Sequence, residues 1–209
     1  MVLRRLKKRY PEEMRTSLSH SNPWELLVAT ILSAQTTDAQ VDKVTPKLFK
    51  RYPNPRSMAG LRPAQLYPYT RSINIYRNKS RNIVMAARMI QSEFGGRVPD
   101  TVDELVRLPG VGRKTANVVM ANAFGRSEGI AIDTHCITVT RRLFLYRTKD
   151  AKKIEERLMR AVPENDWGNV SHLLIALGRD VCTSRRKHCQ DCVLKDVCPS
   201  SDLHNDKGR

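Results

Sequence analysis

Apolar residues recur at spacings of three and four along most of the chain, which is the periodicity of a helix with one buried face. The alternation of apolar and polar residues that marks a half-buried strand is scarce. In the longest predicted helix, over 77–94, Ile83, Val84, Ala87 and Ile90 would share one face. The same spacing predicts helices over 23–34, 38–48, 63–66, 113–124, 133–144, 150–162 and 164–179, and one that begins after Thr101. The predicted fold class is therefore all-α.

Residues that favour helix ends stand at several of the predicted boundaries. Asn22 can cap a helix that has Pro23 in its first position. Thr101 is followed three residues later by Glu104, which is the spacing of a capping box. The glycine pair at 95–96 would end the helix over 77–94. The polar residues after Cys198 are predicted to be disordered.

The chain is strongly basic, with a formal charge of +16 over 209 residues. Self-repulsion at such a charge opposes compaction, so the usual reason for it is a polyanionic partner, and nucleic acid is the leading one. The plain alternative is a basic protein whose charge serves only its solubility. Clustering favours the nucleic-acid interpretation, since basic residues gather at 4–9, 77–81, 141–142 and 185–187.

Membrane and export segments are not expected. No run of about 18 apolar residues is present, so no segment is predicted to span a membrane. The basic N-terminus has no apolar stretch of the kind that a secretory signal needs. We therefore expect a soluble intracellular protein, in a prokaryotic cytoplasm.

Four cysteines lie close together near the C-terminus, at Cys182, Cys189, Cys192 and Cys198. The spacing C-x6-C-x2-C-x5-C can return four thiolates to one metal centre. Zinc favours short pairs, and only one pair here is short, whereas a [4Fe–4S] cluster takes four cysteines and tolerates longer arcs. Two disulfides are the alternative, and the lack of a secretion signal disfavours them. Cys136 lies far upstream among apolar residues and is expected to be buried.

The segment 103–116 reads as helix, glycine turn and helix. Gly110 and Gly112 would let the backbone turn tightly, and the free N–H groups that begin the second helix form an anion site suited to a DNA phosphate. A plain helical hairpin is the alternative. Lys114 stands in the first turn of that second helix, where the helix dipole disfavours a cation and so favours a neutral, nucleophilic amine. A surface lysine that binds phosphate explains the same position equally well.

Asp133 follows the apolar stretch 130–132 and precedes a predicted helix. An aspartate in this place is commonly an N-cap. A carboxylate with limited solvent can also stabilise positive charge that develops on a sugar, and the two roles are compatible.

Three motifs in order along the chain, LPGVGRKTANVV, IDTH and the cysteine tail, resemble the endonuclease III family. This family is the iron–sulfur branch of the helix-hairpin-helix DNA glycosylase superfamily, and the resemblance extends from about residue 22 to residue 198. It implies two lobes with a DNA cleft between them. A six-helix barrel would span 16–126 and contain the helix-hairpin-helix at about 102–124, and an iron–sulfur domain would combine 1–15 with 127–209.

The resemblance also implies roles for individual residues. Lys114 would be the nucleophile and Asp133 its essential partner, while Gln35 would fill the hole left by an extruded base and Ile75 would wedge the opposite strand. Further DNA contacts would come from Gly110, Gly112, Arg113, His135, Arg185, Arg186 and Lys187. The chain departs from the family pattern in two places: Asn74 replaces a glycine before the wedge, and the loop over 126–129 is one residue longer. We expect asparagine to tolerate a left-handed turn at that position and the loop to bulge outward.

The implied function is that of a monomeric DNA glycosylase and AP lyase with a [4Fe–4S] cluster. It would remove oxidised pyrimidines such as thymine glycol from damaged double-stranded DNA and nick the strand by β-elimination. An adenine glycosylase of the same superfamily would typically lack Lys114 and have glutamate where Thr30 stands, and a thymine-mismatch glycosylase would usually have tyrosine at the lysine position. A non-catalytic DNA-binding module would not need both Lys114 and Asp133. The charge and the hairpin disfavour an electron-transfer protein.

Overall fold

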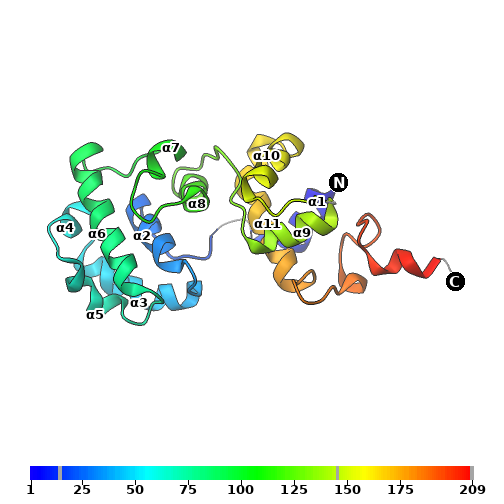
Figure 1. Ribbon diagram of the computed structural model, residues 1–209, viewed down its shortest axis with the longest axis horizontal. Helices are drawn as coiled ribbons and strands as arrows, with labels where there is room; N and C mark the ends of the chain where they lie inside the picture. The colour runs from blue at the N-terminus through cyan, green and yellow to red at the C-terminus, as the bar shows by residue number, and fades with distance from the viewer. Residues whose placement is uncertain (14–15, 145, 208–209) are drawn as a thin grey trace. The chain divides into compact units, whose positions relative to one another are not determined.

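A computed structural model describes residues 1–13, 16–144 and 146–207, and the fold that it shows is helical (Figure 1). Within these residues no β-strand forms, and a single isolated bridge pairs Cys182 with Lys187. The predicted all-α class is confirmed. The chain divides into two compact units, one of residues 17–128 and one that combines residues 1–16 with 129–209.

The unit of residues 17–128 is built around one apolar core. Helix α6 packs against α4, and α2 packs against α8 (Figure 1). The largest fully buried side chains include Leu26, Leu27, Ile83, Leu105 and Met120. The helices of this unit are α2 (Pro23–Ser33), α3 (Asp38–Arg51), α4 (Pro55–Ala59), α5 (Tyr67–Thr70), α6 (Tyr76–Glu93), α7 (Val102–Leu105) and α8 (Arg113–Ala123), with a 3₁₀ turn at Pro63–Leu66.

The predicted caps are present. The side chain of Asn22 accepts a hydrogen bond from the Glu25 N–H at 3.0 Å, and Thr101 accepts one from the Glu104 N–H at 3.3 Å. Helix α4 was not predicted, because five residues are too few to show a helical period. Its start is explained by Asn54, which caps it through a 2.9 Å bond from the Ser57 N–H.

The second unit joins the two ends of the chain in one core. Its helices are α1 (Val2–Arg9), α9 (Thr134–Leu143), α10 (Ala151–Ala161) and α11 (Trp167–Asp180), with 3₁₀ turns at Pro11–Glu13, Glu164–Asp166, Cys189–Asp191 and Asp202–Lys207. Helix α11 packs against α9 and α1. The last of these turns corrects the predicted disorder of the tail as far as residue 207, and residues 208–209 lie outside the described part.

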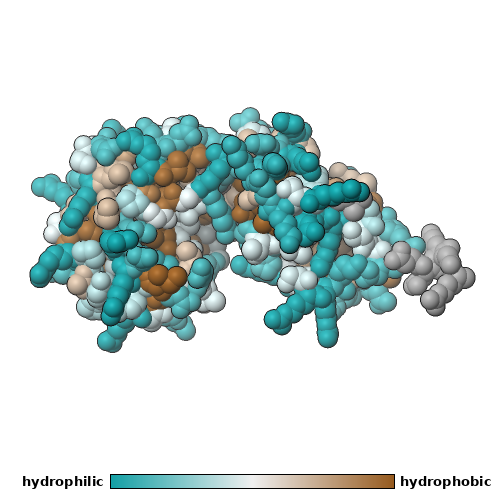
Figure 2. Space-filling model, viewed as in Figure 1, coloured by the Kyte–Doolittle hydropathy of each residue, from teal (hydrophilic) through white to brown (hydrophobic). Residues whose placement is uncertain are grey.

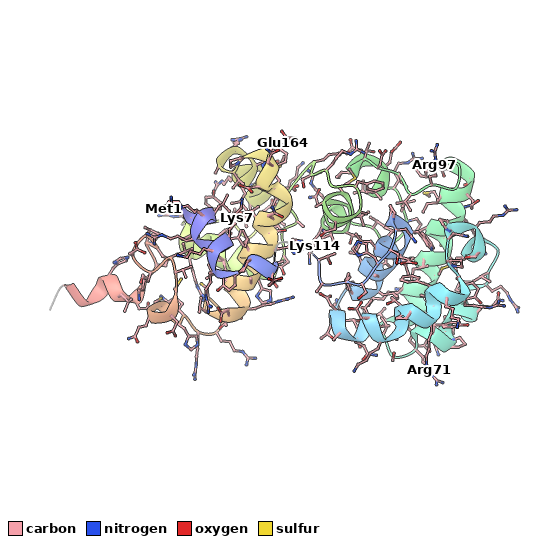
Figure 3. All side chains as sticks on the ribbon, turned by 180° about the vertical axis from the view of Figure 1, so that it is seen from behind. Met1, Lys7, Arg71, Arg97, Lys114 and Glu164 are labelled. Atoms are coloured by element: carbon pink, nitrogen blue, oxygen red, sulfur yellow. The ribbon has the colours of Figure 1, made fainter. Side chains whose placement is uncertain are left out.

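Helix α1 is also fastened to the C-terminal half of the chain by ion pairs. Arg5 pairs with Asp196, and Lys7, labelled in Figure 3, pairs with Asp166. Arg9 pairs with Asp180 at 3.0 Å, and the Tyr10 hydroxyl donates to the same carboxylate at 2.8 Å. The N-terminal segment is therefore part of the unit that contains the cysteines.

The surface drawn in Figure 2 is mainly hydrophilic, with hydrophobic patches over the helices of residues 17–128. One of the few large apolar side chains that stand in solvent is Ile75, which is 56% exposed. Among the described residues no helix is both long enough and apolar enough to cross a membrane.

Candidate active site

The turn between α7 and α8 passes very close to α6. Gly110 has φ +82°, and a Cβ added to it would lie 2.8 Å from Nδ2 and 2.9 Å from Cβ of Asn82. The turn is closed by the Val111 N–H, which donates to the Leu108 carbonyl at 3.0 Å. Both the backbone angle and the close contact therefore require glycine at position 110.

Helix α8 begins without a side-chain cap, because its N-cap residue is Gly112. The N–H groups of a first helical turn have no partner within the helix, so this end attracts anions. Arg113 and Lys114 occupy the first two helical positions, and both are exposed. The Lys114 side chain, labelled in Figure 3, stands at the surface of its unit.

Asp133 is the N-cap of α9, as its position in the sequence predicted, and it is partly exposed. Its Oδ1 accepts a hydrogen bond from the Cys136 N–H at 2.8 Å. The stretch 130–132 that leads to it is buried, and the Ile130 N–H donates to the buried carboxylate of Glu155 at 3.2 Å. These contacts fix the backbone on both sides of Asp133. Since Asp133 and Lys114 belong to different units, their joint action stays a prediction.

The remaining predicted DNA contact on α9 is His135, in the second position of the helix. Its side chain is partly exposed. Helix α11 passes so close to His135 that only glycine fits at position 178 of α11. A Cβ added to Gly178 would lie 2.9 Å from the His135 Cβ. The orientation of the imidazole is thus restricted by packing within its own unit.

Gln35 and Ile75 share an unusual backbone conformation. Among the described residues they are the only ones other than glycine with positive φ, at 56° and 55°. The left-handed residue of this turn is not Asn74, as the sequence had suggested, but Ile75, which the resemblance assigns to the wedge. Asn74 has a different role: its Nδ2 donates to the Gln35 carbonyl at 2.6 Å. The side chain of Ile75 is exposed, which is unusual for an aliphatic residue of this size.

The four C-terminal cysteines line one small cavity, together with Val181, Lys195 and other residues. All are free thiols, so the two disulfides considered from the sequence are not present. Burial raises the pKa of the Cys192 thiol, and the charges of the other three cysteines raise it further. In the described residues no three His, Cys, Asp or Glu side chains are arranged to hold a single metal ion.

The four thiols that line the cavity are the donor set that a [4Fe–4S] cluster takes. Two N–H groups already point at the sulfurs: the Leu194 N–H donates to Cys192 Sγ at 3.4 Å, and Arg142 Nη1 donates to Cys182 Sγ at 3.4 Å. Hydrogen bonds of this kind are a usual feature of iron–sulfur sites. Cys136, in contrast, is fully buried on α9, as expected.

The loop between Cys182 and Cys189 is held by its own polar contacts. Arg142 Nη1 donates to the Thr183 carbonyl at 2.7 Å, and Thr183 Oγ1 accepts from the Arg186 N–H at 3.0 Å. Arg185 and Arg186 are exposed, as a phosphate contact requires. Lys187 instead turns back, pairs with Asp202 and donates to the Ser200 carbonyl at 2.9 Å.

A basic pocket of about 700 Å³ adjoins this loop. It is lined by α9 and the segment that follows it, and it contains four cationic side chains: Arg141, Arg142, Arg147 and Lys149. The sequence indicated only the pair 141–142. Arg147 and Lys149 were missed because they lie in a segment without a motif.

Two further residues were missed although the sequence carried a signal for one of them. Lys79 was counted in the basic group over 77–81, but it is buried and so does not belong to a basic surface; it lies four residues before Ile83 on the apolar face of α6, so the helical period could have flagged it. Glu155 is a buried carboxylate on α10 that no motif marks. In the loop over 126–129, Arg126 pairs with Asp100, and Glu128 accepts from the Val102 N–H at 2.9 Å.

Comparison with known proteins places this geometry among DNA repair enzymes. Residues 28–164 match the model of the HhH-GPD superfamily base excision DNA repair proteins. Endonuclease III of Synechocystis is 46% identical over 200 residues, which cover 96% of this chain and 91% of that protein. Endonuclease III of Bacillus subtilis is 46% identical over 91% of this chain and 87% of its own, and that of Escherichia coli is 39% identical over 94% and 92%.

Solved structures show the same similarity. A trapped endonuclease III–DNA covalent intermediate has a TM-score of 0.88 and 41% identity, over 97% of this chain and 95% of its own. A thermostable thymine-DNA glycosylase, with a TM-score of 0.86 over 97% of this chain and 95% of its own, is only 22% identical, so it supports the fold alone. The identities favour relatives that carry the endonuclease III name over the thymine-mismatch alternative.

Proposed function

The chain belongs to the HhH-GPD superfamily of base excision DNA repair proteins and, within it, to the endonuclease III family, and on this premise we propose that it is a DNA glycosylase with AP lyase activity. Its substrates would be oxidised pyrimidines such as thymine glycol in double-stranded DNA. The observation that carries the proposal is the exposed Lys114, in the first turn of the uncapped helix that follows the glycine turn. The fold and the relatives support the glycosylase, and the lyase step depends on this amine.

The chemistry begins with Lys114 Nζ attacking C1′ of the damaged nucleotide. The N–C1′ bond forms while the glycosidic bond breaks, and the base leaves with the electron pair and takes a proton. The carboxylate of Asp133 stabilises positive charge on the sugar as the base departs. The ring oxygen then leaves C1′ as a hydroxyl, which gives an imine between Lys114 and the open sugar.

The imine makes the strand break possible. It withdraws electrons and so acidifies the C2′ proton, and loss of this proton expels the 3′ phosphate by β-elimination. Hydrolysis of the imine then releases Lys114. One amine therefore serves both steps, which is why a single substitution should remove both.

Binding requires that the damaged nucleotide leave the base stack, at a cost of a few kcal/mol. Gln35 and Ile75 would occupy the vacated space and offset part of this cost. The N–H groups that follow Gly110 and Gly112, with Arg113, would hold a phosphate of the damaged strand. Arg185, Arg186 and the basic pocket on α9 would hold other phosphates, which makes the affinity depend on salt.

A [4Fe–4S] cluster would be held by Cys182, Cys189, Cys192 and Cys198. When bound, it would link the chain at these four points and could also exchange an electron. The residues of the chain do the rest: Arg142 fastens the loop to α9, and Lys187 fastens it to the turn at Asp202–Lys207. The loop would thus present Arg185 and Arg186 in a fixed position.

Borohydride reduction tests the proposal, since it converts the imine into a stable amine and leaves a covalent protein–DNA product. Native protein and Lys114→Gln would be incubated with duplexes that contain thymine glycol, uracil, a mismatched thymine or an abasic site. The exposed Lys47→Gln on α3 is the charge-matched control. We expect trapping and nicking of the thymine glycol and abasic duplexes by the native protein and the control, and neither by Lys114→Gln.

If Lys114→Gln still binds DNA, the role of Lys114 is in catalysis and not in a phosphate contact. Peptide mapping should find the reduced adduct on Lys114. Native-rate nicking by the variant, or an adduct on another residue, would refute the assignment.

A further inference from the structure

The two residues proposed to fill the vacated stack are both held in an unfavourable conformation. A left-handed backbone is disfavoured for every residue with a side chain and most of all for a β-branched one such as Ile75. Such conformations persist only where surrounding contacts enforce them, and they gather at functional sites. Two side chains, Lys79 and Asn74, make hydrogen bonds to the turn that contains Gln35.

Lys79 is the deeper of the two. It lies on α6 one turn after Ile75 and is only 6% exposed. Its ammonium donates to the Leu32 carbonyl at 2.8 Å, the Ala34 carbonyl at 2.5 Å and Thr36 Oγ1 at 3.1 Å. These acceptors bracket Gln35 on both sides. The last carbonyls of a helix have no partner within it and carry partial negative charge, so a cation suits the end of α2.

Charge burial at this position has a cost. Burial lowers the pKa of Lys79, and no carboxylate is among its hydrogen-bond partners. A helix end can be satisfied more cheaply by a glycine or by water. The buried ammonium, unlike a glycine or a water molecule, ties the turn over 33–36 to α6, because its three N–H donors bind three acceptors of that turn and of the end of α2.

Asn74 joins that turn to the second one. Its Nδ2 donates to the Gln35 carbonyl at 2.6 Å, across 39 residues of sequence, and Gln40 Nε2 adds a 3.0 Å bond to Ser72 Oγ nearby. Helix α6 then begins with the Lys79 N–H, which donates to the Ile75 carbonyl at 3.2 Å. Hydrogen bonds thus join the turn before Tyr76 to the turn after Ser33.

We propose that Lys79 and Asn74 are positioning residues that clasp these two turns, so that Gln35 and Ile75 are held at a fixed spacing before DNA arrives. The inference rests on the proposed function and adds to it the residues that set the geometry of the stack-filling pair. Because both side chains are exposed and the backbone that carries them is held by hydrogen bonds in advance, less backbone freedom remains to be lost when they enter the duplex. Asn74, which the resemblance places where a glycine is expected, then has a specific role: it links the turn before α6 to the Gln35 carbonyl.

The test separates this role from a merely structural one by using a substrate without a stack to fill. Lys79→Met and Asn74→Ala would be compared with native protein and with Lys47→Met, an exposed control on α3. Each protein would nick a preformed abasic site in a duplex and in a single strand. We expect the variants to lose on the order of tenfold or more in the duplex, as small misplacements do, and to keep the native single-strand rate within about twofold.

A second readout needs no chemistry. With a reduced abasic analogue opposite 2-aminopurine, the fluorescence of the base analogue reports whether the gap beside it is filled. Native protein and Lys47→Met should change this signal to the same extent, and Asn74→Ala should change it less at saturating protein. Asn74 is exposed, so this variant keeps the test valid if Lys79→Met does not fold.

The outcomes are distinct. Native nicking of both substrates with an unchanged duplex-to-single-strand ratio in the variants would overturn the clasp and leave the proposed function intact. A parallel fall on both substrates would show a structural role only and would also overturn the clasp. A native protein that nicks neither substrate would overturn the proposed function, and the clasp with it.

Discussion

The carboxylate of Asp133 accepts a hydrogen bond from the backbone N–H of Cys136 at 2.8 Å, which makes the residue proposed to act on the sugar also the cap of α9. A capping role and a catalytic role therefore use different properties of the same side chain. The cap needs an acceptor oxygen, whereas charge stabilisation needs the negative charge.

This difference yields the first prediction. Asp133→Asn keeps an acceptor oxygen, and asparagine caps helices about as well as aspartate, so the free energy of unfolding should change by less than about 0.5 kcal/mol. Base excision should nevertheless fall far more than DNA affinity does. Asp133→Ala should lose about 1 kcal/mol of stability as well. Denaturant unfolding and single-turnover excision measure the two effects, and a parallel loss of both in Asp133→Asn would leave capping as its only role.

A second prediction concerns the turn before α8. Gly110→Ala forces a side chain into left-handed backbone and against Asn82, which should cost about 1–2 kcal/mol for the backbone alone and should displace the start of the helix. Gly112→Ala is the matched control, because a Cβ there meets nothing within 4 Å and its φ is −90°. Thermal unfolding and duplex affinity should both decline in the first variant. Equal effects in the two would show that close packing at 110 is unimportant.

The chain sequence was most informative where structure is local. The helix over 77–94 and the caps at Asn22 and Thr101 follow from periodicity and from side chains within three residues of the bond that they make. The order of the three motifs likewise gave the family. These features need no knowledge of which distant segments meet.

Tertiary contacts explain what could not be predicted. Hydrophobicity alone favours a core position for Ile75, yet its side chain is exposed, and the neighbouring Asn74 bonds to the Gln35 carbonyl, a contact that periodicity does not encode. The sequence predicted Lys187 to be a cation available to DNA. In the structure it pairs with Asp202, which lies in a segment that was expected to be disordered. In both cases the bonded partner lies at least 15 residues away in the sequence.

The cysteines give a third prediction. Purified protein should be brown, with about four iron and four sulfide per chain, and Cys192→Ser should lose both. Cys136→Ala is the control, because that thiol is fully buried away from the cavity and should leave the iron content unchanged. Metal analysis and visible absorbance are the measurements. A colourless protein with one zinc per chain would contradict the cluster.

The fourth prediction is a pH dependence of stability in the unit that contains α1. Burial first, and the hydrogen bond to Asp180 second, raise the pKa of the Tyr10 phenol above its usual value. Between about pH 10, where an unfolded tyrosine loses its proton, and the higher folded pKa, the folded state binds more protons than the unfolded state. The contribution of Tyr10 is therefore complete below about pH 10 and is lost as the pH rises through that window.

Tyr10→Phe isolates this contribution, since it keeps the ring and removes the donor. At pH 7 the variant should be less stable by about 1–2 kcal/mol, because the bond that it loses has a charged acceptor that Arg9 continues to satisfy. Lysines titrate in the same alkaline range in both proteins, so the difference between native and variant stability is the quantity to measure. That difference should shrink from pH 9 toward pH 11. A difference that stays constant would mean that the phenol and Asp180 do not interact in solution.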